Sequence, residues 1–174
     1  MAWFRIALVP AVMALVLADG RFDGSYGWAA AVFGVAAVSD FFDGYLARRW
    51  QQASKVGAWL DTIADKVLVT GVLFALVAVD RAWAWAAFII VAREIAVMGL
   101  RGIVAIDGRH VPASGLGKIK ATFQFLAMGL AMVRLADQWG AFYLDEWVML
   151  AAVALTIASA VDYFARFAVV VRRV

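Results

Sequence analysis

Long apolar stretches separated by short polar joints run along nearly the whole chain. The joints are rich in Gly, Asp or Ser, which interrupt helices. A helix that crosses the hydrocarbon core of a bilayer needs about 20 apolar residues, within a range of about 17–25. Six stretches approach or meet this length, and they are 3–18, 26–50, 56–79, 82–106, 116–136 and 146–171. The pattern therefore predicts an all-α integral membrane protein with six transmembrane helices.

Composition supports a membrane protein and narrows its chemistry. The 174 residues are 66% hydrophobic and 17% charged, whereas a soluble domain is roughly half apolar and about a quarter charged. A single small core could not bury this excess, so we expect one domain, residues 1–174, with apolar side chains facing lipid. Cys is absent, which excludes disulfides, thiol nucleophiles and cysteine metal sites. The first stretch has no basic segment before it and no cleavage site, so we expect it to remain as a helix.

The basic residues predict the orientation of these helices. Arg21 and Arg81 fall on the side opposite the N-terminus. The larger group falls on the N-terminal side, and it comprises Arg5, Arg48, Arg49, Lys55, Arg101, Arg109, Lys118, Lys120, Arg172 and Arg173. Because loops rich in Lys and Arg stay in the cytoplasm, we expect both termini to be cytoplasmic.

Four aspartates interrupt the second and third stretches. Asp40 and Asp43 are three residues apart, and Asp61 and Asp65 are four apart, so on a helix each pair shares one face. The joint between the stretches is short, which predicts antiparallel neighbouring helices. At a rise of about 1.5 Å per residue, all four lie within about three turns of that joint. The sequence therefore predicts that four carboxylates converge near the cytoplasmic face.

Such a group is costly unless its charge is compensated. An Asp at the centre of a membrane helix costs about 2.5–3.5 kcal/mol on insertion scales. Protonation, pairing with Lys66 or Arg48, or a bound divalent cation would each remove this cost. Mg²⁺ prefers carboxylate oxygens, and paired ions can clamp the attacking and leaving oxygens of phosphoryl transfer. A structural charge network and a proton relay remain as alternatives.

The residues around the aspartates form a longer motif. It reads Asp40-x-x-Asp43-Gly44-x-x-Ala47-Arg48, then eight residues, then Gly57-x-x-x-Asp61-x-x-x-Asp65. This pattern resembles the signature of the CDP-alcohol phosphatidyltransferases. The resemblance implies a six-helix membrane enzyme, commonly dimeric, that transfers a phosphatidyl or similar group from a CDP-linked donor to an alcohol and releases CMP.

The resemblance also implies roles for the motif residues. Asp40, Asp43 and Asp61 would hold two divalent metal ions, Mg²⁺ or Mn²⁺. Asp65 would act as a further metal ligand, as the general base for the attacking hydroxyl, or as both.

The other motif residues would bind the donor. Gly44, Ala47 and Gly57 are small enough for cytidine and its diphosphate to approach the backbone, although small residues also serve close helix packing. Arg48 offers a planar fork for the diphosphate, and its alternative role is a topology charge.

Charged residues in the second half of the chain suggest the acceptor. The segments "VAREIAVMGLRG" and "SGLGKIKATFQ" resemble the phosphatidylglycerophosphate synthase branch of this family, except that Ala121 precedes Thr122. An acceptor carrying a phosphate, such as sn-glycerol 3-phosphate, needs cationic partners. Lys118 and Lys120 could instead bind lipid head groups, and Arg93 could pair with Glu94. The candidate acceptor ligands are Arg93, Arg101, Lys118 and Lys120, with Arg166 a weaker one.

The expected reaction joins CDP-diacylglycerol and glycerol 3-phosphate into phosphatidylglycerophosphate and CMP. Inositol phosphate, serine or phosphatidylglycerol as acceptor, or a cation or proton transporter, are the alternatives. We expect a homodimer in the bacterial inner membrane, surrounded by lipid, with a site open to the cytoplasm and no nucleic-acid partner.

Overall fold

The computed structural model describes residues 2–18, 21, 24–50, 55–106 and 115–172. For residues 2, 40–50, 55–56, 58, 106 and 170–172 it describes the backbone alone. Statements about side chains below concern the remaining residues.

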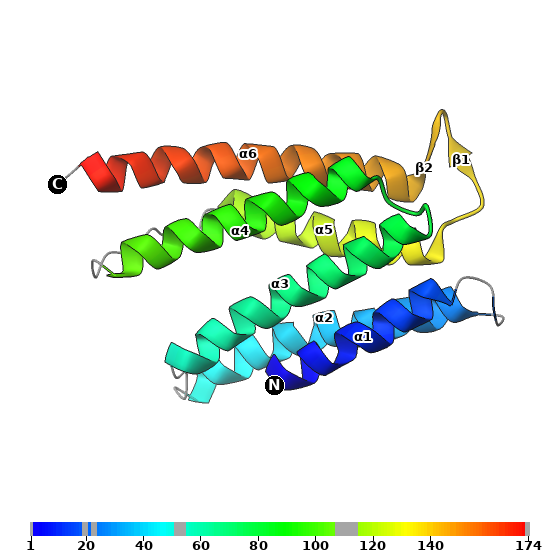
Figure 1. Ribbon diagram of the computed structural model, residues 1–174, viewed down its shortest axis with the longest axis horizontal. Helices are drawn as coiled ribbons and strands as arrows, with labels where there is room; N and C mark the ends of the chain where they lie inside the picture. Colours follow the sequence, from blue (N-terminus) through cyan, green and yellow to red (C-terminus); the bar gives the residue numbers. More distant parts are fainter. Residues whose placement is uncertain (1, 19–20, 22–23, 51–54, 107–114, 173–174) are drawn as a thin grey trace.

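Six helices make up almost all of this part of the chain (Figure 1). They are α1 (Ala2–Leu17), α2 (Ser25–Trp50), α3 (Lys55–Ala78), α4 (Ala84–Ile106), α5 (Gly115–Val133) and α6 (Leu144–Arg172). Each begins and ends within three residues of an apolar stretch in the sequence. The prediction of an all-helical protein with six helices is therefore confirmed.

The segment between α5 and α6 differs from the expected plain joint. The fifth helix ends at Val133 because Arg134 adopts a left-handed conformation with φ of 36°. Two short antiparallel strands follow, β1 (Gln138–Trp139) and β2 (Phe142–Tyr143). The turn between them contains Gly140 at φ of 76°, a conformation that glycine adopts without steric cost.

The helices form an elongated bundle in which α1, α2 and α3 lie on one side and α4 and α6 on the other (Figure 1). Extensive contacts join α1 to both α2 and α3, and α5 to α6. In the described part of the chain, α1 therefore contacts both helices that carry the aspartates. Gly71 allows α1 and α3 to meet closely, because a Cβ there would lie 2.6 Å from Cγ1 of Val9.

The outer surface of the bundle is apolar. Large side chains such as Phe88, 71% exposed, and Val161, 65% exposed, point away from the core. Such a surface is typical of a protein that faces lipid. Among the described residues, Gly115–Val133 and Leu144–Val169 are long and apolar enough to cross a membrane.

The charged helices do not pass this test. The α3 helix carries Asp61, Asp65 and Lys66, and α4 carries Arg93, Glu94 and Arg101. Charges inside otherwise apolar helices are costly and mark functional sites. The charged residues that lower the hydropathy of α3 and α4 therefore mark the candidate site.

Candidate active site

A buried carboxylate connects three helices near the middle of the bundle. Glu94 on α4 is 4% exposed and forms ion pairs with Lys66 of α3 and Lys120 of α5. Its neighbour Arg93 donates from Nη1 to Oε1 of Glu94 at 3.1 Å. A buried charge must be paired, because its desolvation is otherwise very costly. Glu94 therefore joins α4 to α3 through Lys66 and to α5 through Lys120.

A cavity of about 330 Å³ opens beside this cluster, between α3 and α4. We call it the α3–α4 cavity, and its polar and aromatic lining includes Trp59, Thr62, Lys66, Arg93, Glu94 and Arg101. Its volume falls within the range of small-molecule sites, about 300–1,000 Å³. The three cations outnumber the one carboxylate in this lining, so the cavity is suited to an anionic ligand.

Asp61 and Asp65 lie next to this cavity on α3. Each precedes a lining residue, Thr62 or Lys66, so the carboxylate face is about 100° around the helix from the cavity face. Oδ2 of Asp65 lies 3.4 Å from Nζ of Lys66, and Oδ1 of Asp61 lies 3.9 Å from Nη1 of Arg5. Both carboxylates are partly exposed, so they can reach a ligand or metal ion.

The other half of the predicted metal site is described only as backbone. Asp40 and Asp43 lie in α2, and their side chains are outside the described residues, as are those of Gly44, Ala47 and Arg48. Among the residues whose side chains are described, no three acidic or histidine residues gather closely enough to hold a metal. The four-carboxylate site therefore stays a prediction.

The backbone is compatible with that prediction. Segments 40–48 and 57–65 are continuously helical, so the spacings of three and four residues do place each aspartate pair on one helix face. The described carboxylates of Asp61 and Asp65 supply oxygen donors, which suit a hard cation such as Mg²⁺. The donor set that is described therefore fits a divalent metal.

The predicted acceptor ligands occupy different environments. Arg93 and Arg101 line the α3–α4 cavity, while Lys120 is 3% exposed and bound to Glu94. Lys118 is exposed on the first turn of α5 and is outside that lining. Arg166 donates from Nε to Oδ1 of Asp162 at 3.0 Å, one turn away on α6. Geometry thus brings Arg93, Arg101 and Lys120 to the same region and leaves Lys118 and Arg166 apart from it.

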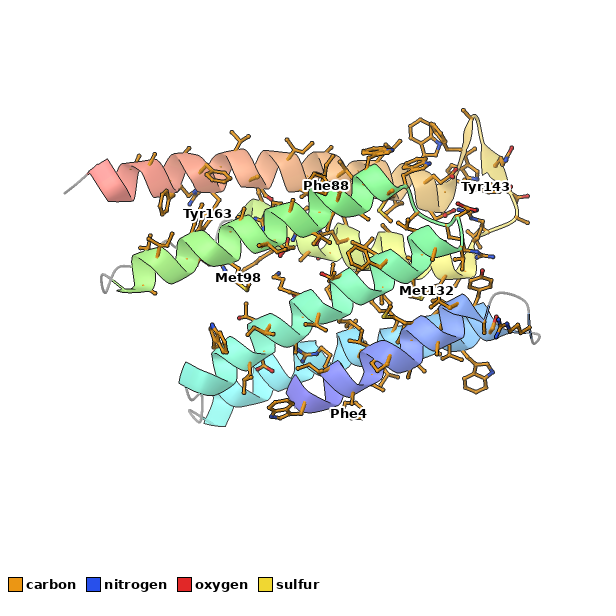
Figure 2. All side chains as sticks on the ribbon, in the orientation of Figure 1. Phe4, Phe88, Met98, Met132, Tyr143 and Tyr163 are labelled. Atoms are coloured by element: carbon orange, nitrogen blue, oxygen red, sulfur yellow. The ribbon has the colours of Figure 1, made fainter. Side chains whose placement is uncertain are left out.

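Arg101 also contacts α6. Its guanidinium carbon lies 5.4 Å from the ring centre of Tyr163, a distance typical of a cation–π contact. Figure 2 shows Tyr163 between α6 and α4, where it packs with Val97 and Val104. Tyr163 therefore supports one wall of the cavity from behind.

Comparison with known proteins identifies the family. The profile of the CDP-alcohol phosphatidyltransferase family matches residues 1–163. The chain belongs to this family.

Curated relatives from several bacteria are similar over most of their length. A "CDP-diacylglycerol--glycerol-3-phosphate 3-phosphatidyltransferase" of Bacillus subtilis (strain 168) is 35% identical over 93% of this chain and 90% of the relative. A "Probable phosphatidylglycerophosphate synthase" of Mycobacterium tuberculosis (strain CDC 1551 / Oshkosh) is 37% identical over 93% of this chain and 77% of the relative. The Escherichia coli (strain K12) protein with the same name as the Bacillus relative is 39% identical over 76% of this chain and 70% of its own. These matches agree with the resemblance seen in the motif, and they place this phosphatidyltransferase family member among membrane-associated proteins.

Sequence reasoning missed the part that two residues play at this candidate site. Glu94 was considered only as a partner of Arg93, yet it also binds Lys66 and Lys120. Arg5 was taken as a topology charge, although it is 1% exposed and close to Asp61. The available signal was a charged residue inside an apolar stretch, which is expensive unless it has a role. The partners could not be identified because they lie on other helices.

Proposed function

We propose that this protein transfers the phosphatidyl group of CDP-diacylglycerol to sn-glycerol 3-phosphate. The acceptor hydroxyl oxygen would form a bond to the phosphatidyl phosphorus, the phosphorus–oxygen bond to CMP would break, and the hydroxyl proton would pass to a base. The products are phosphatidylglycerophosphate and CMP. The observation that carries the proposal is the 35–39% identity to bacterial relatives named for this reaction, over most of the chain.

The α3–α4 cavity supports an acceptor with its own phosphate. Arg93 and Arg101 from α4 and Lys66 from α3 present cations to one small volume. Arginine binds phosphate through paired hydrogen bonds, and lysine binds it as a point charge. We assign the acceptor phosphate to this cationic lining. An acceptor without a phosphate would offer no phosphate to this lining, in which three cations face one carboxylate.

Asp65 is the residue that we assign as general base. Its carboxylate is partly exposed, and it follows the cavity-lining Thr62 by one helical turn. A hydroxyl of an acceptor held in the cavity could therefore donate its proton to Asp65 over a short path. Lys66 beside it would hold the acceptor phosphate near the same carboxylate.

The metal and the donor would occupy the α2 side of the site. Asp40, Asp43, Asp61 and Asp65 would hold two divalent ions, Mg²⁺ or Mn²⁺, which when bound supply positive charge at the transferring phosphoryl group. Gly44, Ala47 and Gly57 would admit the cytidine and its diphosphate close to the backbone, and Arg48 would pair with that diphosphate. Lys118 and Lys120 would extend the positive field around the acceptor.

The membrane setting follows from the same proposal. Six transmembrane helices with both termini in the cytoplasm would open the site toward cytoplasmic glycerol 3-phosphate, at the inner membrane of a bacterium. The bias of basic residues toward one side supports this orientation. A homodimer is the expected assembly.

A direct experiment is to purify the protein in detergent micelles with CDP-diacylglycerol and to measure CMP release. Mg²⁺ and Mn²⁺ would be tested separately, and the acceptor panel would include glycerol 3-phosphate, inositol phosphate, serine and phosphatidylglycerol. We expect CMP release that depends on metal and on glycerol 3-phosphate. Failure to release CMP with every metal and acceptor would reject the enzyme class, and preference for serine would reject the acceptor.

A further inference from the structure

A second, apolar hollow runs along the outside of the bundle between α1 and α3. It has a volume of about 430 Å³. We call it the α1–α3 groove, and its lining includes Met13, Val67, Thr70, Gly71, Phe74 and Met98. Apart from Thr70 and one lysine, its side chains are apolar. Val67 and Phe74 are among the exposed hydrophobic residues, so the groove opens toward the lipid-facing surface.

The groove is continuous with the cationic cavity. Lys66 and Met98 line both the α3–α4 cavity and the α1–α3 groove. In Figure 2 Met98 lies on the side of α4 that faces α3. The cationic α3–α4 cavity and the apolar α1–α3 groove therefore meet at Lys66. This arrangement is complementary to an amphiphile whose polar head lies beside the cavity and whose hydrocarbon chain follows the groove.

The length of the groove is close to the depth of one leaflet. From Lys66 to Phe74 its lining on α3 extends roughly 12 Å along the helix, at about 1.5 Å per residue. Half of a hydrocarbon core of about 30 Å is about 15 Å. An acyl chain that begins at the head-group level would therefore span the groove and end near Phe74.

The floor of the groove is held by close helix packing. Gly71 lies against Val9 and Met13 of α1, and a Cβ at this position would clash with Val9. Because α1 and α3 touch here, the groove is shallow and takes one chain rather than a folded peptide or a bulky head group. The position of α1 against α3 is therefore part of the groove's shape.

We propose that the α1–α3 groove binds one acyl chain of the CDP-linked lipid donor, with Lys66 at the point where the lipid changes from polar to apolar. This inference rests on the proposed function, because it assigns a place to the tail of the proposed donor. The second acyl chain remains in the surrounding bilayer. Lys66 thus faces the acceptor phosphate in the cavity on one side and the start of the donor's hydrocarbon on the other.

The test compares two tryptophan substitutions with two donors. Thr70→Trp places a large side chain midway along the groove, and Ile95→Trp places the same side chain on the lipid-facing surface of α4, outside both linings. The donors are dihexanoyl and dipalmitoyl CDP-diacylglycerol in detergent micelles. We expect Thr70→Trp to lower kcat/KM about tenfold for the dipalmitoyl donor, because an overfilled site is strained, and to change the dihexanoyl value much less. Ile95→Trp should change neither.

The outcomes separate the two proposals. Equal effects of Thr70→Trp and Ile95→Trp on both donors, with an active wild type, would overturn the groove and leave the reaction intact. A wild type without transfer would reject the reaction instead.

A second measurement does not depend on the folding of a variant. A dipalmitoyl donor with a photoreactive diazirine at the end of one chain is bound to the wild type and irradiated. Labelling concentrated on the α3 segment around Phe74 or on Met13 supports the proposal. Labelling spread over the outer faces of α4 and α6 contradicts it, whether or not the reaction takes place.

Discussion

The two ends of the helix bundle use their charged residues in different ways. At the end where α3 joins α4, Arg81 donates from Nη1 to the carbonyl oxygens of Ala131 and Met132, at 3.1 and 3.0 Å. It also stacks over Tyr26, with 3.6 Å from the guanidinium carbon to the ring centre. The last carbonyls of a helix have no partner within the helix, so Arg81 completes the C-terminus of α5.

Arg134 has a similar role at that end. Its Nη2 lies 3.2 Å from Oδ2 of Asp145 and 3.9 Å from Oε1 of Glu146, at the start of α6. Its guanidinium also lies over Tyr143, at 5.0 Å from the ring centre. Both arginines are thus used by the fold itself.

In the opposite half of the bundle, cationic side chains remain able to bind a ligand. Glu94 pairs with Lys66, Arg93 and Lys120, and Asp65 adds a contact to Lys66. Nε of Arg93 is buried without a hydrogen-bond acceptor among the described residues. Among the described residues, Arg101 contacts a ring rather than a carboxylate. The comparison teaches that the two arginines in the connecting segments are bound by groups of the fold, whereas the two arginines of α4 line a cavity.

The largest expected effect is at Asp65. Asp65→Asn should lower kcat by about 10²–10⁴-fold, because an amide cannot act as the proposed general base. The thermal unfolding midpoint should change little, since the side chain is partly exposed. The matched control is Asp162→Asn, another partly exposed carboxylate paired with a cation. Equal losses in the two variants would contradict a special role for Asp65.

The next effect concerns stability. Glu94→Gln should lower the free energy of unfolding by about 3–5 kcal/mol, because it leaves buried cations uncompensated. Chemical unfolding in detergent measures this value, and Glu94→Asp should restore part of it. Glu146→Gln at the other end should cost about 1 kcal/mol or less, because its pair is more exposed. A similar cost for both would remove the contrast between the two ends.

A smaller effect is expected on acceptor binding. Arg101→Ala should raise KM for glycerol 3-phosphate about ten- to a hundredfold, the range for losing a hydrogen bond to a charged group. Steady-state kinetics with saturating donor would show it. Arg166→Ala serves as control because Arg166 is paired with Asp162 outside the cavity. An unchanged KM in Arg101→Ala would exclude Arg101 from the acceptor site.

The smallest expected effect is a loss of stability at the end of the bundle where α3 joins α4. Arg81→Met should lower the free energy of unfolding by about 1–3 kcal/mol, because two helix carbonyls lose their donor. KM for both substrates should stay unchanged, since Arg81 is remote from the cavity lining. A raised KM without loss of stability would show that the two ends are not separate in function.

Much of the fold could be predicted from the sequence because apolar stretches and polar joints are local signals. The end of α5 was missed because it depends on the left-handed conformation of Arg134, and the hairpin was missed because strands of two residues have no detectable period. The close packing of α1 on α3 also escaped prediction, since it is decided by contacts such as Gly71 with Val9.

The sequence predicted those features of the site that depend on the spacing of residues within one helix. The pairing of Asp61 with Asp65 on one face follows from their separation alone. The ion pairs of Glu94 with Lys66 and Lys120 require the rotation of three helices about their axes, which no short motif encodes. The same helix rotations place Arg93 and Arg101 in the cavity lining and leave Lys118 outside it, so the sequence could not separate them.

The turn between α3 and α4 has a mechanical consequence. Asp80 adopts φ of 55°, and the amide of Arg81 donates to the carbonyl of Leu76 at 2.9 Å, a compact termination of α3. From this turn the two helices diverge toward the other end (Figure 1). A tilt of one degree at the turn would move a point about 30 Å away by about half an ångström. The width of the α3–α4 cavity is therefore sensitive to small changes in the geometry of this turn.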